Sequence, residues 1–238
     1  MIAIRDITVS FGGVTALNAL TVDLADPVVG IIGPNGAGKT TFLNVLSGFV
    51  TPKTGTINAF GAELLSLRPH QRSRWGLRRS FQKEQVVDEL TVEENIGVVL
   101  DNLQLSSGQY QHFLAAALDF AGLAAVRREK AAGLNAFQRR MTEVARCAAG
   151  QPKLLLLDEP GAGLSQNEVE ILRRTISEIH AFNGAMILLI DHDVDLIQAV
   201  CSSTMVLDFG SLVTAGPTRE VLSDSRVRAV YLGVEELA

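Results

Sequence analysis

A glycine-rich segment that ends in a lysine and two threonines constrains this chain more than any other part of its sequence. It follows an apolar run with the length of a buried strand, Val28–Ile32, and precedes a helical pattern over Lys39–Ser47. Glycines allow a turn in which successive backbone N–H groups point at phosphate oxygens, and the start of the helix adds its positive dipole end. The segment therefore predicts a binding site for nucleotide phosphates, and a purely structural turn is the weaker alternative. Its residues match the Walker A pattern in full: Gly33, Pro34, Asn35, Gly36, Ala37, Gly38, Lys39, Thr40 and Thr41.

Two side chains of this segment have chemical functions that a nucleotide site needs. Lys39 is predicted to place a positive charge on the β- and γ-phosphates, and the Thr40 hydroxyl is predicted to bind Mg²⁺. ATP and Mg²⁺ are accordingly the predicted cofactors.

A second motif consists of four leucines, Leu154–Leu157, followed by Asp158 and Glu159. The leucines predict a buried strand, and ligands of open α/β sheets bind at the carboxyl ends of such strands. Asp158 is expected to hold Mg²⁺, and Glu159 is expected to polarise the attacking water as a general base. A carboxylate after a strand often only caps a turn, but its pairing with the Walker A segment favours the catalytic interpretation.

Strand-like apolar runs alternate with helical patterns along most of the chain, which predicts parallel strands joined by helices. Ile2–Leu24 instead shows the short alternating runs of antiparallel strands, and no strand signal occurs between Thr91 and Gly133. We expect an α/β fold: a P-loop NTPase (RecA-like) core with an antiparallel β subdomain and a helical insertion subdomain. Residues 1–238 would form one domain, with a core lobe at about 1–82 and 152–238 and a helical lobe at about 83–151. Further predicted strands are Ala185–Ile190 and Thr204–Asp208, and further predicted helices are Val92–Leu100, Tyr110–Ala121, Ala124–Lys130, Gln166–His180 and Val194–Cys201.

Charge and composition argue against several classes of protein. A net charge of −5 argues against a nucleic-acid-binding protein. No run approaches the roughly 18 apolar residues of a membrane span, and the chain begins without a secretory signal pattern, so any membrane association is expected to be through a protein partner. The two cysteines, Cys147 and Cys201, have no metal-binding spacing and suggest a reducing compartment. Five arginines between Arg68 and Arg79 are expected to form a solvated or partner-facing patch.

Beyond these motifs, the chain resembles the ATP-binding subunits of ABC transporters along nearly its whole length. Ser80-Phe81-Gln82 resembles the Q-loop of that family, and Ile190-Asp191-His192-Asp193 resembles its switch-histidine segment. The resemblance implies that Gln82 contacts Mg²⁺ or the attacking water and that His192 contacts the γ-phosphate. It also implies that Phe11 stacks on adenine, with a position in the hydrophobic core as the alternative.

The resemblance is strongest to importer ATPases that serve branched-chain amino acids and related small polar solutes. It implies an ATPase that converts ATP and water to ADP and phosphate and drives transport. Such a subunit would lie at the cytoplasmic face of the inner membrane, bound to transmembrane permease subunits and not itself inserted. Lipopolysaccharide-export ATPases share much of the C-terminal sequence, so the direction of transport stays open. The similar segments are Phe11–Gly13, Arg79–Gln82, Leu90–Asn95 and Ala229–Gly233.

One segment departs from the family pattern. In ABC ATPases each ATP lies between the Walker A segment of one subunit and the signature sequence Leu-Ser-Gly-Gly-Gln of another. Here Leu134–Gln138 stands in the signature position, ahead of a helix expected at about Arg139–Gly150. Asn135 retains a polar donor, whereas Phe137 replaces a glycine that allows close approach of the backbone to phosphate.

This departure favours a heterodimer in which a second ATPase subunit supplies an intact signature. A homodimer of low activity is the alternative. Two other functions stay open: a regulatory subunit that binds ATP with little turnover, and an ABC ATPase that remodels nucleic acid or ribosomes. The acidic charge and the lack of a second ATPase unit or a coiled-coil insert count against the last of these.

Overall fold

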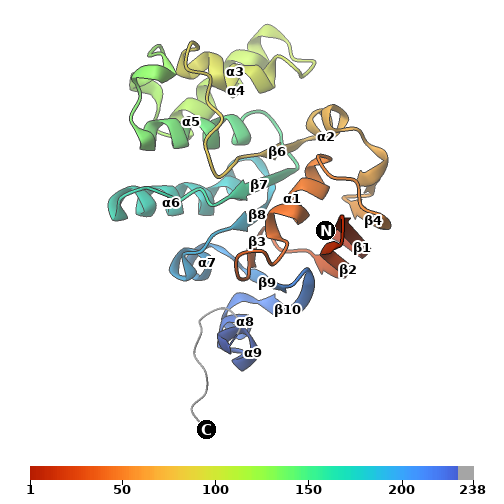
Figure 1. Cartoon of the computed structure of the whole chain (residues 1–238). Helices are drawn as coiled ribbons and strands as arrows, with labels where there is room; N and C mark the ends of the chain where they lie inside the picture. Colours follow the sequence, from red (N-terminus) through yellow and green to blue (C-terminus); the bar gives the residue numbers. More distant parts are fainter. Residues whose placement is uncertain (230–238) are drawn as a thin grey trace. The chain divides into compact units, whose positions relative to one another are not determined.

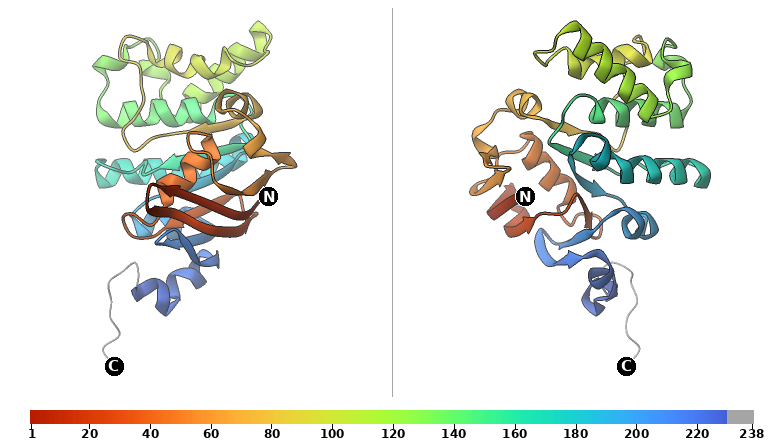
Figure 2. Two further views of the ribbon diagram at one scale, coloured as in Figure 1. Left: turned by 45° about the vertical axis from the view of Figure 1, so that its right-hand side comes forward. Right: turned by 180° about the vertical axis from the view of Figure 1, so that it is seen from behind.

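The N-terminal residues form two long antiparallel strands in the computed structural model, which describes residues 1–229. β1 (Ile2–Phe11) pairs with β2 (Val14–Leu24) on one side and with β4 (Thr54–Ala59) on the other, both antiparallel. With β5 (Ala62–Glu63) they form a four-stranded sheet of order β2-β1-β4-β5, whose first strands are drawn in red in Figure 2. The antiparallel subdomain predicted for Ile2–Leu24 is confirmed.

The chain folds into two compact units. Of the described residues, one unit comprises Met1–Ser73 and those from Leu188 to Ala229, and the other comprises Arg74–Ile187. The chain returns from the second unit to the first within β8 (Met186–Ile190). The lobe boundaries predicted from the sequence, near residues 82 and 152, stay a prediction.

The first unit also contains strands of mixed direction. β3 (Val28–Ile32), buried at every residue, pairs in parallel with β9 (Ser203–Asp208), and β10 (Ser211–Pro217) pairs antiparallel with β9. Both strands of the parallel pair were predicted, whereas β10 has no predicted counterpart because its residues are mostly half-buried and form no apolar run. The helices that lie or begin in this unit are α1 (Lys39–Ser47), α2 (Pro69–Trp75), α7 (Val194–Val200), α8 (Thr218–Ser223) and α9 (Ser225–Val227), with a 3₁₀ turn at Leu64–Ser66.

In the second unit, β6 (Leu77–Arg79) pairs in parallel with β7 (Leu154–Asp158), the strand predicted from the leucine run. α3 (Val92–Leu100), α4 (Ser107–Phe120) and α5 (Ala136–Ala148) pack on one another (Figure 1), and the first two lie between Thr91 and Gly133, where the sequence predicted a helical insertion. The fold is therefore α/β with antiparallel and mixed strand pairs and a helical segment, as predicted. The helices of the second unit are α3 (Val92–Leu100), α4 (Ser107–Phe120), α5 (Ala136–Ala148) and α6 (Gln166–Asn183), with 3₁₀ turns at Ala124–Val126 and Ala131–Gly133.

The helix predicted at Ala124–Lys130 is wrong, because only its first residues form a single 3₁₀ turn. The backbone that follows accepts hydrogen bonds from the start of α3. The Val92 and Glu93 N–H groups donate to the carbonyls of Glu129 and Arg127, each at 3.0 Å. A sequence pattern of helical period gives no sign of such a pairing between distant segments.

The arginine cluster is only partly the solvated patch that the sequence predicted. Arg68 and Arg74 are exposed, but Arg72 and Arg78 are only 4% and 6% exposed. The Arg72 guanidinium donates to the carbonyls of Val45 and Leu46 in the last turn of α1. Helix ends leave carbonyls without intrahelical partners, so this arginine caps α1. Burial lowers the pKa of Arg72.

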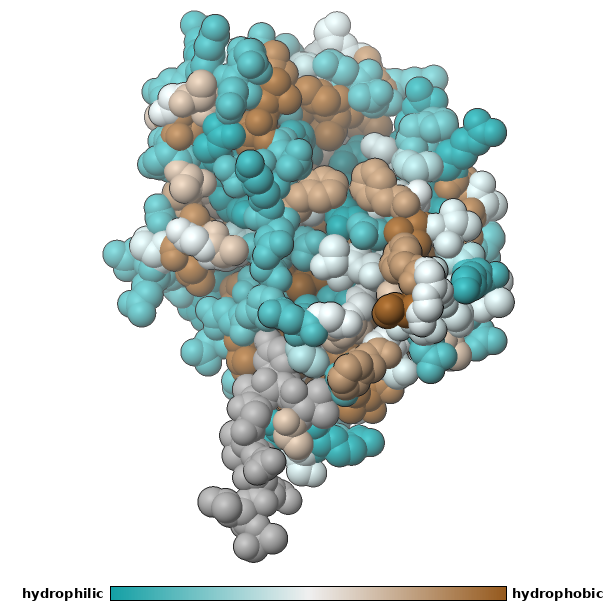
Figure 3. All heavy atoms as spheres, in the orientation of Figure 1, coloured by the Kyte–Doolittle hydropathy of each residue, from teal (hydrophilic) through white to brown (hydrophobic). Residues whose placement is uncertain are grey.

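Hydrophobic side chains gather over α3 and α4 on the face shown in Figure 3. Val98 of α3 and Val87, which precedes that helix, are 42% and 44% exposed. None of the helices within residues 1–229 combines the length and the apolar character that a membrane span requires.

Candidate functional site

The predicted phosphate-binding segment forms a tight loop between β3 and α1. Gly38 has φ +100° and precedes the first residue of α1, and no side chain caps this helix. A Cβ atom at Gly38 would lie 2.5 Å from the carbonyl oxygen of Ala16, and a Cβ atom at Gly33 would collide with the carbonyl of Leu207. Glycine is therefore required at both positions for the loop to pack against its neighbouring strands.

Lys39 is buried within this loop and is only 7% exposed. Its Nζ donates to the carbonyl oxygens of Gly33 and Pro34 at 2.6 and 3.0 Å, so the ammonium lies inside the curve of the loop. The neighbouring Thr40 is an exposed residue. Other members of the predicted set are also accessible: Asn35 and Gly36 are exposed, and Pro34 and Thr41 are half-buried.

Phe11 and His192 are both exposed residues of the first unit. Phe11 ends β1 with 54% of its surface exposed, so the alternative that it belongs to the core is wrong. His192 follows β8 and lies between two aspartates that organise the turn. Asp191 Oδ1 accepts from the Asp193 N–H at 3.0 Å, and Asp193 caps α7. The turn thus holds His192 at the carboxyl end of a strand, where the sequence places a ligand contact.

Three predicted site residues come together in the second unit: Gln82, Asp158 and Glu159. Gln82 Nε2 donates to Glu159 Oε2 at 2.8 Å. The Asp158 carboxylate forms an ion pair with Arg79 at 3.4 Å, and both side chains are 6% exposed. Burial lowers the pKa of Arg79, and the Asp158 charge opposes this effect. The amide of the Q-loop-like segment therefore contacts the carboxylate predicted to be the general base.

Glu159 has an unusual backbone conformation for a residue other than glycine. Its φ is +48°, and its carbonyl accepts from the Ala162 N–H at 3.2 Å. Such left-handed conformations cost energy and cluster at functional sites. The carboxylate predicted to be the general base thus belongs to a strained residue directly after β7.

The sequence did not identify Arg79, Arg140 or Glu143 as parts of this arrangement. Arg140 and Glu143 are buried in α5 at 4% and 0% exposure, and Arg140 Nη1 donates to Glu143 Oε2 at 2.7 Å. Opposite charges three residues apart on a helix usually form an exposed surface pair. Their spacing alone therefore gave no signal that they are buried.

The signature-position segment begins α5 with a complete capping box. Asn135 Oδ1 accepts from the Gln138 N–H at 2.8 Å, and Gln138 Oε1 accepts from the Asn135 N–H at 3.1 Å. This cap explains why α5 begins at Ala136 and not near Arg139, as the sequence predicted. One first-turn N–H that a phosphate would otherwise bind is occupied by the helix's own side chain, and Phe137 is half-buried beside it.

The predicted metal-binding residues provide oxygen donors: the Thr40 hydroxyl, the Gln82 amide and the Asp158 carboxylate. Within residues 1–229, no group of three or more His, Cys, Asp or Glu side chains is placed to hold a metal. Mg²⁺ usually keeps several waters and is bound through one or two protein oxygens together with substrate phosphates. An exposed residue with a hydroxyl group, Thr40 at the end of the phosphate loop, fits this kind of binding.

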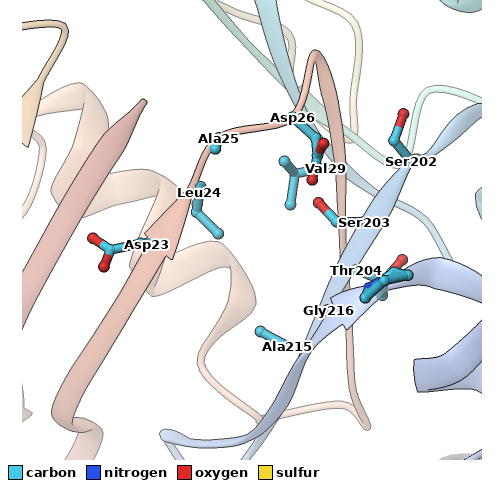
Figure 4. A pocket seen from close by; sticks show the side chains of 11 residues that line it. Asp23, Leu24, Ala25, Asp26, Val29, Ser202, Ser203, Thr204, Ala215 and Gly216 are labelled. Carbon is cyan, nitrogen blue, oxygen red and sulfur yellow. The ribbon is translucent and has the colours of Figure 1, made fainter.

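A pocket of about 260 Å³ in the first unit contains none of the predicted site residues (Figure 4). It lies between the end of β2, the start of β9 and the end of β10. Its lining combines two carboxylates with small hydroxyl side chains. The lining residues are Asp23, Leu24, Ala25, Asp26, Val29, Ser202, Ser203, Thr204, Ala215, Gly216 and Pro217.

Comparison with known proteins adds three results. The ABC transporter family model matches residues 17–162. The high-affinity branched-chain amino acid transport ATP-binding protein LivG of Salmonella typhimurium is 34% identical over 98% of this chain and 98% of its own length. The lipopolysaccharide export system ATP-binding protein LptB of Acidithiobacillus ferridurans is 36% identical over 87% of this chain and 85% of its own length.

Among solved structures, the ADP conformation of MJ1267, an ATP-binding cassette of an ABC transporter, superposes with a TM-score of 0.84. It is 27% identical, and the match covers 98% of this chain and 99% of that one. The segment Ala229–Gly233, which contributed to the resemblance found in the sequence, lies outside the described residues except for Ala229.

Proposed function

Because this chain belongs to the ABC transporter family as an ATP-binding subunit, we propose that it hydrolyses ATP to drive the uptake of a small polar solute such as branched-chain amino acids. The observation that carries this proposal is the contact between Gln82 and Glu159 directly after β7, in a chain that also has a complete phosphate loop. The full-length similarity to the branched-chain amino acid transport protein LivG supports the choice of solute.

Phosphate binding is assigned to the loop between β3 and α1. The backbone N–H groups of Gly33–Thr41 and the Lys39 ammonium would bind the β- and γ-phosphates, and the N-terminus of α1 would add its dipole. Phe11, which is exposed, would stack on adenine, and His192 would contact the γ-phosphate. Burial of Lys39 in the loop holds its charge in place before the phosphates arrive, which reduces the reorganisation needed for binding.

Hydrolysis is assigned to the residues after β7. Glu159 would accept a proton from the attacking water, and the Gln82 amide would orient the same carboxylate and water. Thr40, Gln82 and Asp158 would hold Mg²⁺, which neutralises phosphate charge when it is bound. The products would be ADP and phosphate, released after attack of water on the γ-phosphorus.

Transport requires partner subunits. Transmembrane permease subunits would anchor the chain at the cytoplasmic face of the inner membrane, and the exposed Val87 and Val98 support a contact there. A second ATPase subunit would face the phosphate loop of this chain with an intact signature. The heterodimer is favoured over the homodimer because α5 begins with a capping box and a phenylalanine.

The proposal is tested by Mg-ATP hydrolysis of the purified chain over a range of protein concentrations. The control is the Glu159→Gln variant. We expect it to bind ATP but to turn over roughly 10²–10⁴-fold more slowly than the wild type, the range for loss of a general base. Turnover that rises faster than linearly with concentration would indicate a working homodimer. ATP binding with turnover only after addition of a different ATPase subunit would indicate the heterodimer. A Glu159→Gln variant that hydrolyses ATP like the wild type would remove Glu159 from the mechanism.

Lipopolysaccharide export is a second candidate, favoured by the similarity to LptB over most of the chain. The two candidates differ in their permease partners. Purification of the intact membrane complex, followed by identification of the permease subunits, would decide between them.

A further inference from the structure

The buried ion pair of α5 binds the main chain of the Q-loop-like segment. Arg140 donates to the carbonyl of Phe81 at 3.0 Å and to the carbonyl of Gln82 at 2.9 Å. Glu143 Oε1 accepts from the N–H groups of Phe81 and Gln85 at 3.3 and 3.1 Å. Two side chains of α5 therefore bind both N–H and carbonyl groups of the backbone segment that contains Gln82.

Burial of this pair needs an explanation other than stability. The side chain of Arg140 is 5% exposed and that of Glu143 is 0% exposed. Two charges removed from water lose hydration, and a buried pair of this kind is often no more stabilising than apolar residues of similar size. The pair instead constrains the backbone of Phe81–Gln85, because its two charged groups can form their hydrogen bonds to this backbone only when it takes one conformation.

The position of Gln82 has a direct consequence for the proposed chemistry. The side chain of Gln82 is exposed and donates to Glu159 at 2.8 Å, and its own carbonyl is held by Arg140. We propose that Arg140 and Glu143 are positioning residues for ATP hydrolysis, because they fix the Gln82 backbone so that its amide stays on the Glu159 carboxylate. The proposal rests on the proposed function of Gln82 and Glu159.

This arrangement also links the start of α5 to the hydrolytic residues. Arg140 lies two residues after Gln138, the last residue of the capping box. A shift of the first turns of α5 would move Arg140 and Glu143 with it, and thereby the backbone of Gln82. The state of the signature-position segment would thus control the contact between Gln82 and Glu159.

Arg140→Lys is the principal test. A lysine keeps the positive charge for Glu143, but its single ammonium cannot bind two carbonyls in the planar geometry of a guanidinium. We expect ATP affinity to stay unchanged and turnover of the assembled transporter to fall by roughly 10- to 100-fold. A loss of this size is expected when a catalytic group is slightly misplaced. Exchange of the Phe81 and Gln85 amide hydrogens should become faster in the purified full chain, while the amides of Leu154–Asp158 should exchange as before.

Arg139→Lys is the matched control. Arg139 neighbours Arg140 on α5, but it binds Glu84, Asp88 and the carbonyl of Ala131, not the Phe81 or Gln82 carbonyl. It should leave turnover and the exchange of the Phe81 amide nearly unchanged. If Arg140→Lys does not fold, Glu143→Gln serves in its place, since it keeps the shape and one carbonyl acceptor but removes the charge that Arg140 needs.

A double-mutant cycle with Gln82→Ala separates positioning from general damage. If Arg140 acts through Gln82, Arg140→Lys should lower turnover in the wild type but have almost no further effect in Gln82→Ala. Multiplicative effects of the two changes would overturn the positioning proposal while the function of Gln82 stands. Wild-type turnover of Gln82→Ala alone would instead refute the proposed function of Gln82, and the positioning proposal with it.

Discussion

Two helices of this chain begin at segments that the ABC family places against phosphate, and they begin in different ways. α1 follows Gly38, has no side-chain cap, and starts with the buried Lys39. α5 follows Asn135, whose side chain accepts from the Gln138 N–H while the Gln138 side chain accepts from the Asn135 N–H. No side chain caps the start of α1, whereas the start of α5 binds one of its own first-turn N–H groups, that of Gln138, through a side chain.

The residues next to the start of each helix increase this difference between α1 and α5. Glycines in the loop before α1 allow the backbone to approach a ligand, while Phe137 places a ring in the first turn of α5. A helix N-terminus is therefore not sufficient to predict a phosphate site. Its donors must also be free of a capping side chain, and the adjacent residues must be small.

The largest effect is expected at α1. Lys39→Ala removes the charge that the loop holds, and turnover should fall by about 10²–10³-fold, the loss expected for one electrostatic contact to developing charge. The measurement is ATP hydrolysis together with ATP binding by calorimetry. Lys53→Ala, at an exposed lysine of the same unit, is the control and should behave like the wild type. Unchanged hydrolysis in Lys39→Ala would show that α1 is not the phosphate-binding start.

A smaller effect in the opposite direction is expected at α5. Asn135→Ser combined with Phe137→Gly restores the family pattern at two positions, and should increase turnover of the chain alone by at least about tenfold if the altered start limits a homodimer. Phe137→Ala is the matched control, because it removes the ring but keeps a Cβ atom. A double variant that stays inactive alone but works with a different ATPase subunit would show that the signature-position segment is not what prevents homodimer activity.

The sequence predicted the region around α1 better than the region around α5, for a physical reason. The phosphate loop is a local pattern: its glycines, its lysine and the flanking strand and helix lie within 20 consecutive residues, Val28–Ser47. β3 and α1 accordingly have the bounds that the sequence predicted.

The missed features depend on contacts between distant residues. Arg72 caps α1 from 27 residues away, and Arg140 binds the Phe81 carbonyl from 59 residues away. An arginine in a helical pattern gives the same signal whether its guanidinium meets water or a buried carbonyl. The capping box of α5 was, in contrast, readable in principle, since Asn135 and Gln138 have its spacing. The same residues stand in the signature position, which predicts a phosphate contact and not the cap of a helix.

The cap of α5 predicts a moderate change in stability. Asn135→Ala removes the acceptor for the Gln138 N–H and should lower the free energy of unfolding by about 1 kcal/mol. Urea unfolding followed by circular dichroism measures this difference. Asn135→Asp, which retains an acceptor and places a negative charge at the helix start, should keep the wild-type stability. Equal stability of the alanine variant would mean that the capping box does not hold in solution, and the contrast between the two helices would then weaken.

The smallest expected effect is a local opening of the folded structure. The two cysteines can report such opening separately in two parts of the chain. Cys147 lies in α5 and Cys201 directly follows α7, and burial raises the pKa of each thiol to about 12. Since the thiolate is the reactive form, both should react with iodoacetamide very slowly at pH 8, and faster only as the pH rises toward the raised pKa or the local structure opens. Asn135→Ala should accelerate labelling of Cys147 and leave Cys201 unchanged, as measured by mass spectrometry of the peptides. Equal acceleration at both cysteines would show that the cap stabilises the whole chain and not the start of α5 alone.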